Sequence, residues 1–166
     1  GSTNHFEVGG FIKSDSSKKA PDIQFHFLPA AMTYDGSVQI KEHGFQVHIG
    51  PMQSKSRGCV TLRTSNPLDN PRLNFGYMSD PEDWVVFRSA IRLAREIFSQ
   101  RAFNELRGEE ISPGDWIQSD YKLDDFIRAR CESAYHPCGT CKIGSDEQGV
   151  VDSKGLVHSL DGLRVA

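Results

Sequence analysis

A short segment at residues 133–144 concentrates the residue types of this chain that could do chemistry. Its twelve positions hold an aromatic residue, a histidine, a proline and two cysteines. An imidazole can accept or donate a proton near neutral pH, so His136 is a candidate for proton transfer with a substrate. Because a proline disfavours the helical conformation of the residue before it, Pro137 predicts that His136 lies at a junction between a helix and a loop. The alternative is that His136 only packs and hydrogen-bonds at the end of a helix.

The two cysteines of this segment, Cys138 and Cys141, have the Cys-x-x-Cys spacing found in zinc sites and thiol redox motifs. Zinc would need two further ligands at suitable spacing, and the remaining candidates, Cys59, Cys131 and His158, contain no second paired motif. We interpret the cysteines as structural thiols, with a metal or redox module at Cys138 and Cys141 as the alternative. Four cysteines in this chain do not indicate a disulfide-linked secreted domain.

Length and charge restrict the class of protein. A chain of 166 residues suits one domain with a hydrophobic core. The net charge of −3, from 19 basic and 22 acidic residues, provides no electrostatic basis for binding nucleic acid or an anionic membrane. No apolar run approaches the roughly 20 residues needed to span a bilayer. We expect a globular cytoplasmic protein that binds no nucleic acid, and we leave membrane association of a longer protein open.

The hydrophobic pattern places strands before helices. Alternating apolar and polar residues predict strands at 5–12, 23–28, 45–49 and 60–62. In the first of these, Gly9-Gly10 indicates a bulge or a close backbone approach. Turns are predicted at Tyr34-Asp35-Gly36 and between Asp152 and Gly155. Strands followed by helices, rather than alternating with them, predict the α+β class.

Two helices are expected in the second half of the chain. Asp80 can cap the first helix, and Pro81 suits its first position because proline has no N–H to satisfy there. This helix should run to about Gln100, and a second helix should cover 120–131. The first helix carries an apolar stripe that we expect in the core rather than at a cofactor: Trp84, Phe87, Ile91, Ala94 and Phe98.

Several separated motifs resemble one enzyme family. Residues 135–144, with 150–152 and 162–166, resemble the C-terminal signature of the glucose–methanol–choline (GMC) family of FAD-dependent alcohol oxidoreductases. Residues 4–12, 24–29 and 56–58 are similar to the choline-oxidising branch of that family. The resemblance implies a substrate-binding domain over 3–166, built as an antiparallel sheet with helices packed on one face. Gly1-Ser2 is interpreted as a cloning remnant.

The resemblance also implies an activity for the complete enzyme and roles for three residues. The reaction is oxidation of choline, or a similar quaternary-ammonium alcohol, to its aldehyde in glycine betaine synthesis, with FAD taking the hydride. His136 matches the active-site histidine that accepts the hydroxyl proton or stabilises the alkoxide. Glu7 matches a glutamate that binds the cationic group, and Tyr135 matches the aromatic residue beside the histidine. Judged by its own pattern alone, Glu7 reads as a solvated strand residue and Tyr135 as a core aromatic. Where some choline oxidisers have a further histidine, this chain has Gln53.

The chain lacks the Gly-x-Gly-x-x-Gly fingerprint of dinucleotide binding. We therefore expect an excised domain whose partner is its own FAD-binding domain, and which alone binds no FAD tightly and oxidises no alcohol. The alternatives are a GMC dehydrogenase for another primary alcohol, the Cys-x-x-Cys module and a stand-alone binder of quaternary ammonium compounds. The natural electron acceptor is left open.

Overall fold

The computed structural model describes residues 4–32 and 43–165, and the chain divides into two compact units. The residues of unit 1 are Gly1–Arg57 and Tyr77–Arg130, and those of unit 2 are Gly58–Gly76 and Cys131–Ala166. The turn predicted at Tyr34-Asp35-Gly36 lies outside the described residues.

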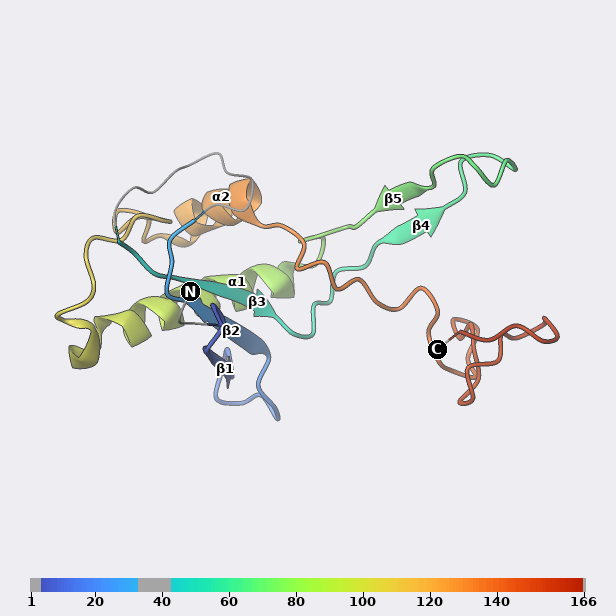
Figure 1. Cartoon of the computed structure of the whole chain (residues 1–166), viewed down its shortest axis with the longest axis horizontal. Helices are drawn as coiled ribbons and strands as arrows, with labels where there is room; N and C mark the ends of the chain where they lie inside the picture. The colour runs from blue at the N-terminus through green and yellow to red at the C-terminus, as the bar shows by residue number, and fades with distance from the viewer. Residues whose placement is uncertain (1–3, 33–42, 166) are drawn as a thin grey trace. The chain divides into compact units, whose positions relative to one another are not determined.

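Unit 1 contains a three-stranded antiparallel sheet in the order β1-β2-β3 (Figure 1). Its strands are β1 (Val8–Ile12), β2 (Ile23–Leu28) and β3 (Gln46–Pro51), which confirms the first three predicted strands. Pairing in β1 is continuous through both glycines, so the bulge that we considered is not formed. A Cβ on Gly9 would lie 3.2 Å from the carbonyl oxygen of Phe25, which makes this the site of close approach.

The core of unit 1 lies between this sheet and the helix α1 (Pro81–Ser99). Asp80 caps α1 by accepting a hydrogen bond from the Glu82 N–H at 2.8 Å, as its sequence predicted. Five residues from the two elements form the buried cluster: Ile23, Phe25, Val86, Ala90 and Ala94. The inward-facing side chains of β2 therefore pack with the small residues of α1 in one core.

The predicted core stripe of α1 is only partly correct. Ile91 and Ala94 are buried, whereas the larger stripe residues Trp84, Phe87 and Phe98 are half-buried. The helix has apolar residues on two sides. The side that meets the sheet contains Val86 and Ala90, which are not part of the predicted stripe. The pattern alone could not decide which apolar side would face the sheet.

The second helix, α2 (Asp120–Arg130), packs against α1, and a short 3-10 turn, η1 (Arg101–Phe103), follows α1. Leu123 and Ile127 are buried on α2. Arg88 of α1 pairs with Asp124 of α2, with Nη1 and Oδ1 2.7 Å apart. An antiparallel sheet with helices on one face confirms the predicted α+β class (Figure 1).

Unit 2 begins with the antiparallel hairpin of β4 (Cys59–Thr61) and β5 (Arg72–Asn74). The predicted fourth strand is confirmed as β4, but it forms a separate sheet with β5, which we did not expect. β5 starts directly after Pro71, a position that a strand tolerates because its first residue can follow a proline. All six residues of the two strands are exposed.

The C-terminal part of unit 2 is held by isolated bridges rather than long strands. Val151 is at their centre, paired with Ile143 and with Val157, and it is 2% exposed. The predicted turn is confirmed, because the Gly155 N–H donates to the Asp152 carbonyl at 3.0 Å. Within the described ranges, no helix has both the length and the apolar character needed to cross a bilayer.

Candidate functional site

His136 is exposed on an irregular loop that follows α2 in the chain. The helix ends at Arg130, so five residues separate it from His136 and the predicted position at the helix end is wrong. The reason is that Pro137 restricts only its immediate predecessor and does not require a helix before it. Because the imidazole is exposed and lies beyond the helix, the alternative of packing at the end of a helix is not observed either, and the ring is able to reach a small molecule.

Tyr135, directly before His136, has an unusual backbone conformation. Its φ is +60°, in the left-handed region that bulky residues rarely adopt. The Tyr135 N–H donates to Ser133 Oγ at 2.9 Å, a local turn that fixes the backbone here. The side chain is 79% exposed, so Tyr135 is not a core aromatic. Non-glycine residues held in this region often occur at functional sites.

The loop is attached to the rest of unit 2 at its C-terminal end. The Lys142 carbonyl accepts from the Val150 N–H at 2.8 Å and from the Val151 N–H at 3.2 Å. His158 Nε2 lies 2.8 Å from the Gly144 carbonyl oxygen. No sequence motif indicates this contact of His158, because it joins residues 14 positions apart and depends on the bridges that fold the 143–157 segment.

The structure brings together no metal site at the cysteines. Cys138 and Cys141 are exposed free thiols, and Cys131 is a partly buried one. Burial, followed by the negative charge of Glu132, raises the pKa of the Cys131 thiol and makes it less reactive. Over residues 4–32 and 43–165, no three His, Cys, Asp or Glu side chains are grouped so that they could hold a metal ion.

Glu7 lies in unit 1, one residue before β1 begins, and is exposed. Its Oε1 accepts a hydrogen bond from the Asn4 N–H at 3.1 Å. It takes part in no ion pair within the described part of the chain. Its negative charge is therefore available to a cationic ligand.

The Ser56-Arg57-Gly58 motif of the sequence is anchored by a buried carboxylate, that of Asp83 in the first turn of α1. Asp83 is 2% exposed and accepts hydrogen bonds from Ser54 Oγ at 2.5 Å, the Lys55 N–H at 2.8 Å and the Ser56 N–H at 2.9 Å. Burial by itself raises the pKa of this carboxyl, but the hydrogen bonds from the 54–56 segment lower it below its ordinary value. The anchor holds the chain just before unit 2 begins.

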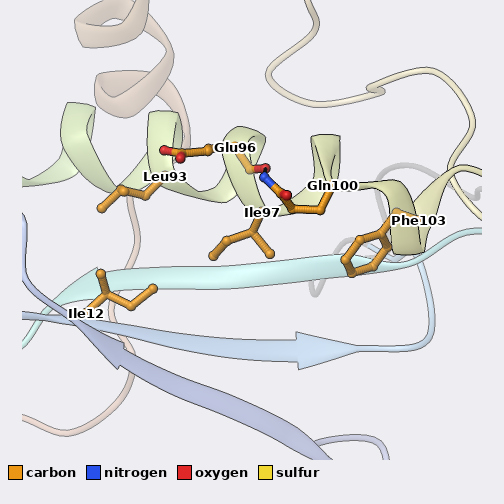
Figure 2. Close-up of a pocket in the computed structure, with 6 residues that line it drawn as sticks. All are labelled: Ile12, Leu93, Glu96, Ile97, Gln100 and Phe103. Carbon is orange, nitrogen blue, oxygen red and sulfur yellow. Dashed lines mark hydrogen bonds between the residues drawn. The ribbon is translucent and has the colours of Figure 1, made fainter.

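Unit 1 also contains an apolar depression, which is lined by residues other than His136, Tyr135 and Glu7. Figure 2 shows it between α1 and the sheet, lined by Ile12, Leu93, Glu96, Ile97, Gln100 and Phe103. None of the predicted site residues lines it. Its hydrocarbon lining, with a single carboxylate and no partner base, does not provide the groups for alcohol oxidation.

The helices of this chain do not fit the diphosphate of FAD. A pyrophosphate binds at a helix N-terminus that offers free N–H groups and no competing anion. The first turn of α1 carries Glu82 and Asp83, and α2 begins with Asp120, whose carboxylate is held by Arg92. These carboxylates disfavour a phosphate at either helix start, so α1 and α2, the α-helices within residues 4–32 and 43–165, offer no diphosphate site of that kind.

Comparison with known sequences gives a consistent result. A sequence model described as GMC oxidoreductase matches residues 54–166. An oxygen-dependent choline dehydrogenase of Brucella anthropi is 54% identical over 168 aligned residues, covering 100% of this chain and 31% of the relative. One of Escherichia coli O139:H28 is 54% identical, covering 99% of this chain and 30% of the relative. The chain thus spans about a third of the length of the curated relatives that it matches.

Solved structures agree on the fold. Pyridoxine 4-oxidase from Mesorbium loti superposes with a TM-score of 0.85 at 26% identity, covering 97% of this chain and 32% of the other. Formate oxidase of Aspergillus oryzae has a TM-score of 0.77 at 26% identity, covering 89% and 27%. An FAD-dependent oxidoreductase from Chaetomium thermophilum has a TM-score of 0.61 at 34% identity, covering 65% and 19%. The chain belongs to the GMC oxidoreductase family and has the α+β fold of its C-terminal domain.

Proposed function

We propose that this chain is the substrate-binding part of a longer FAD-dependent choline dehydrogenase, which oxidises choline to betaine aldehyde. The observation that carries the proposal is the exposed imidazole of His136 in a chain that is 54% identical, along its whole length, to choline dehydrogenases. The exposure suits a group that must meet a substrate. The identity favours choline over the alcohols of other family members.

His136 would act on the hydroxyl group of the substrate. Oxidation of a primary alcohol removes the hydroxyl proton and, from the adjacent carbon, a hydride. The neutral imidazole of His136 takes the proton and becomes an imidazolium, while the carbon–oxygen bond becomes a carbonyl. FAD, when bound, supplies the hydride acceptor. A positive charge on His136 also stabilises negative charge that develops on the oxygen.

Glu7 and Tyr135 would act on the cationic end of choline. A quaternary ammonium group donates no ordinary hydrogen bonds, so carboxylates and aromatic faces are the groups that can recognise it. Glu7 supports this role because it is exposed and has no ion-pair partner among the described residues. Tyr135 supports it because the left-handed backbone and the Ser133 turn present its ring to solvent.

The FAD-binding domain of the same protein would be the partner of this chain. The acidic first turns of α1 and α2 support this proposal, because neither helix start suits the cofactor diphosphate. The β4–β5 hairpin supports the need for a partner, because its strands and connection expose four apolar side chains: Val60 (53%), Leu62 (83%), Leu68 (89%) and Leu73 (59%). Exposed apolar residues at this density are typical of surfaces that another domain covers.

The test uses the complete enzyme with FAD and an artificial electron acceptor. The substrates are choline and its neutral isostere, in which a quaternary carbon replaces the ammonium nitrogen. We expect kcat/KM to be at least about tenfold higher for choline, because only choline gains the contacts to the cation. Equal values for both alcohols would overturn the assignment to choline and favour a dehydrogenase for another primary alcohol. The isolated chain should show no turnover under the same conditions.

A further inference from the structure

The His136 loop has one well-fixed end, formed by the backbone of residues 142–144. The Lys142 carbonyl accepts two backbone hydrogen bonds from 150–151, and the Gly144 N–H donates to the Val151 carbonyl at 3.0 Å. Val151 is 2% exposed, so this end of the loop rests on a buried residue of unit 2. A contact that stabilises residues 142–144 therefore limits the movement of the His136 loop.

Side chains add to this backbone pairing: Lys142 Nζ pairs with Asp146 Oδ2 at 2.8 Å, and His158 is the side chain that contacts the Gly144 carbonyl. His158 Nε2 lies 2.8 Å from the Gly144 carbonyl oxygen, and the His158 N–H donates to the Val150 carbonyl at 3.0 Å. Because a carbonyl oxygen only accepts hydrogen bonds, the imidazole must donate, and its proton is on Nε2. His158 thus connects to both segments that flank the 145–149 turn.

The Gly144 carbonyl is also close to the backbone of Gly149. A Cβ placed on Gly149 would lie 2.2 Å from the Gly144 oxygen, closer than real Cβ atoms come. The Gly149 N–H donates to the Asp146 carbonyl at 2.9 Å and so holds the turn in this compact form. With the Gly149 backbone close to it and the His158 ring bonded to it, the Gly144 carbonyl has little freedom to shift.

We propose that His158 is a positioning residue, which holds the C-terminal end of the loop so that His136 stays at the distance needed for proton transfer. The inference rests on the proposed role of His136. A general base works only within hydrogen-bond reach of the proton that it takes, and small displacements of such a group reduce the rate strongly. Without the Nε2–H donor, residues 142–144 keep their backbone bonds but lose the contact that fixes the Gly144 carbonyl.

The experiment compares three variants of the complete enzyme. His158→Ala removes the donor. His158→Gln keeps an N–H donor at the same number of bonds from Cα as the histidine Nε2. In His158→Asn the N–H donor is one bond closer to Cα, so it does not reach the Gly144 carbonyl. His43→Ala, an exposed histidine of unit 1, is the matched control. We measure kcat for choline with an artificial acceptor, and amide hydrogen exchange of the peptide covering 142–151.

We expect His158→Ala and His158→Asn to lower kcat by about threefold to tenfold, as the loss of one hydrogen bond would. Exchange in 142–151 should be faster in both, and His158→Gln and His43→Ala should stay close to wild type. If His158→Ala does not accumulate as folded enzyme, the Asn and Gln pair makes the same comparison. Faster exchange with unchanged kcat would show a merely structural contact and overturn the inference, as would a Gln variant as slow as the Asn variant.

A His136→Ala variant separates this inference from the function on which it rests. If His136→Ala retains turnover, the proposed function fails. If His136→Ala is inactive while the His158 variants keep wild-type kcat, the positioning role alone is wrong.

Discussion

The buried carboxylate of Asp83 accepts a hydrogen bond from Ser54 Oγ at 2.5 Å, which joins the first turn of α1 to the segment that precedes Ser56-Arg57-Gly58.

Asp83→Asn replaces one acceptor oxygen by an NH2 group that faces existing donors. We expect the free energy of unfolding to fall by about 2–4 kcal/mol, because buried donors lose their acceptor. Urea unfolding followed by tryptophan fluorescence measures this. Asp161→Asn, at an exposed position, is the control and should change stability by no more than about 0.5 kcal/mol; equal losses in both variants would contradict the anchor role.

Acid should weaken unit 1 through two buried carboxylates. Burial raises the pKa of Asp22 and of Asp83, but hydrogen bonds from Ser14 to the former and from 54–56 to the latter lower both below their ordinary values. A carboxyl whose pKa is lower in the folded state stabilises the fold at pH values above its unfolded-state pKa, which is about 3.9. This stabilisation is lost as the pH falls through the folded-state pKa. Urea midpoints between about pH 6 and pH 3 should therefore fall less steeply in an Asp22→Asn, Asp83→Asn double variant than in wild type. Equally steep curves would refute this.

Much of the fold of unit 1 could be predicted because its signals are local. Alternation at Ile23 and Phe25 indicates β2, and Asp80-Pro81 marks the start of α1. The buried ridge of α1 could not be predicted, since the helix has apolar residues on two sides and only tertiary packing selects the one that meets the sheet. The pairing of β4 with β5 is also non-local, and both strands are too short and exposed to carry a strong pattern.

Glu7→Gln tests recognition of the cationic end of the substrate. In the complete enzyme we expect kcat/KM for choline to fall about tenfold, the cost of losing one moderately screened ionic contact. The value for the neutral isostere of choline should not change, because that alcohol has no charge to lose. Glu105→Gln, another exposed glutamate of unit 1, should leave both values at wild type. An equal decrease in kcat/KM for the two alcohols would mean that Glu7 does not recognise the positive charge of choline.

Tyr135 should contribute its aromatic face rather than its hydroxyl. We expect Tyr135→Phe to keep the KM for choline and Tyr135→Ala to raise it about tenfold, the size of a partly desolvated cation–π contact. Steady-state kinetics of the complete enzyme measures both. Tyr121→Ala on α2, where the tyrosine is 74% exposed, is the matched control. A KM that rises equally in the Phe variant would assign the effect to the hydroxyl group instead.

The candidate site was only partly predictable. The exposure of His136 and Glu7 agrees with the roles that the family resemblance implies, but the sequence contains no sign of the left-handed backbone at Tyr135. The contact of His158 with Gly144 depends on isolated bridges between single residues. The segments that form these bridges have no repeating hydrophobic pattern that would predict them. Local motifs therefore predict this loop as a candidate site, whereas its support comes from contacts that only the folded chain shows.

The most direct test of the account is the turnover of choline by a His136→Ala variant of the complete enzyme, measured together with its thermal unfolding. We predict that kcat falls at least about a hundredfold, the usual contribution of a positioned general base. The unfolding midpoint should match that of wild type and of a His43→Ala control, because His136 is exposed on its loop. Wild-type turnover, or a loss of activity that follows an equal loss of stability, would contradict the catalytic role of His136.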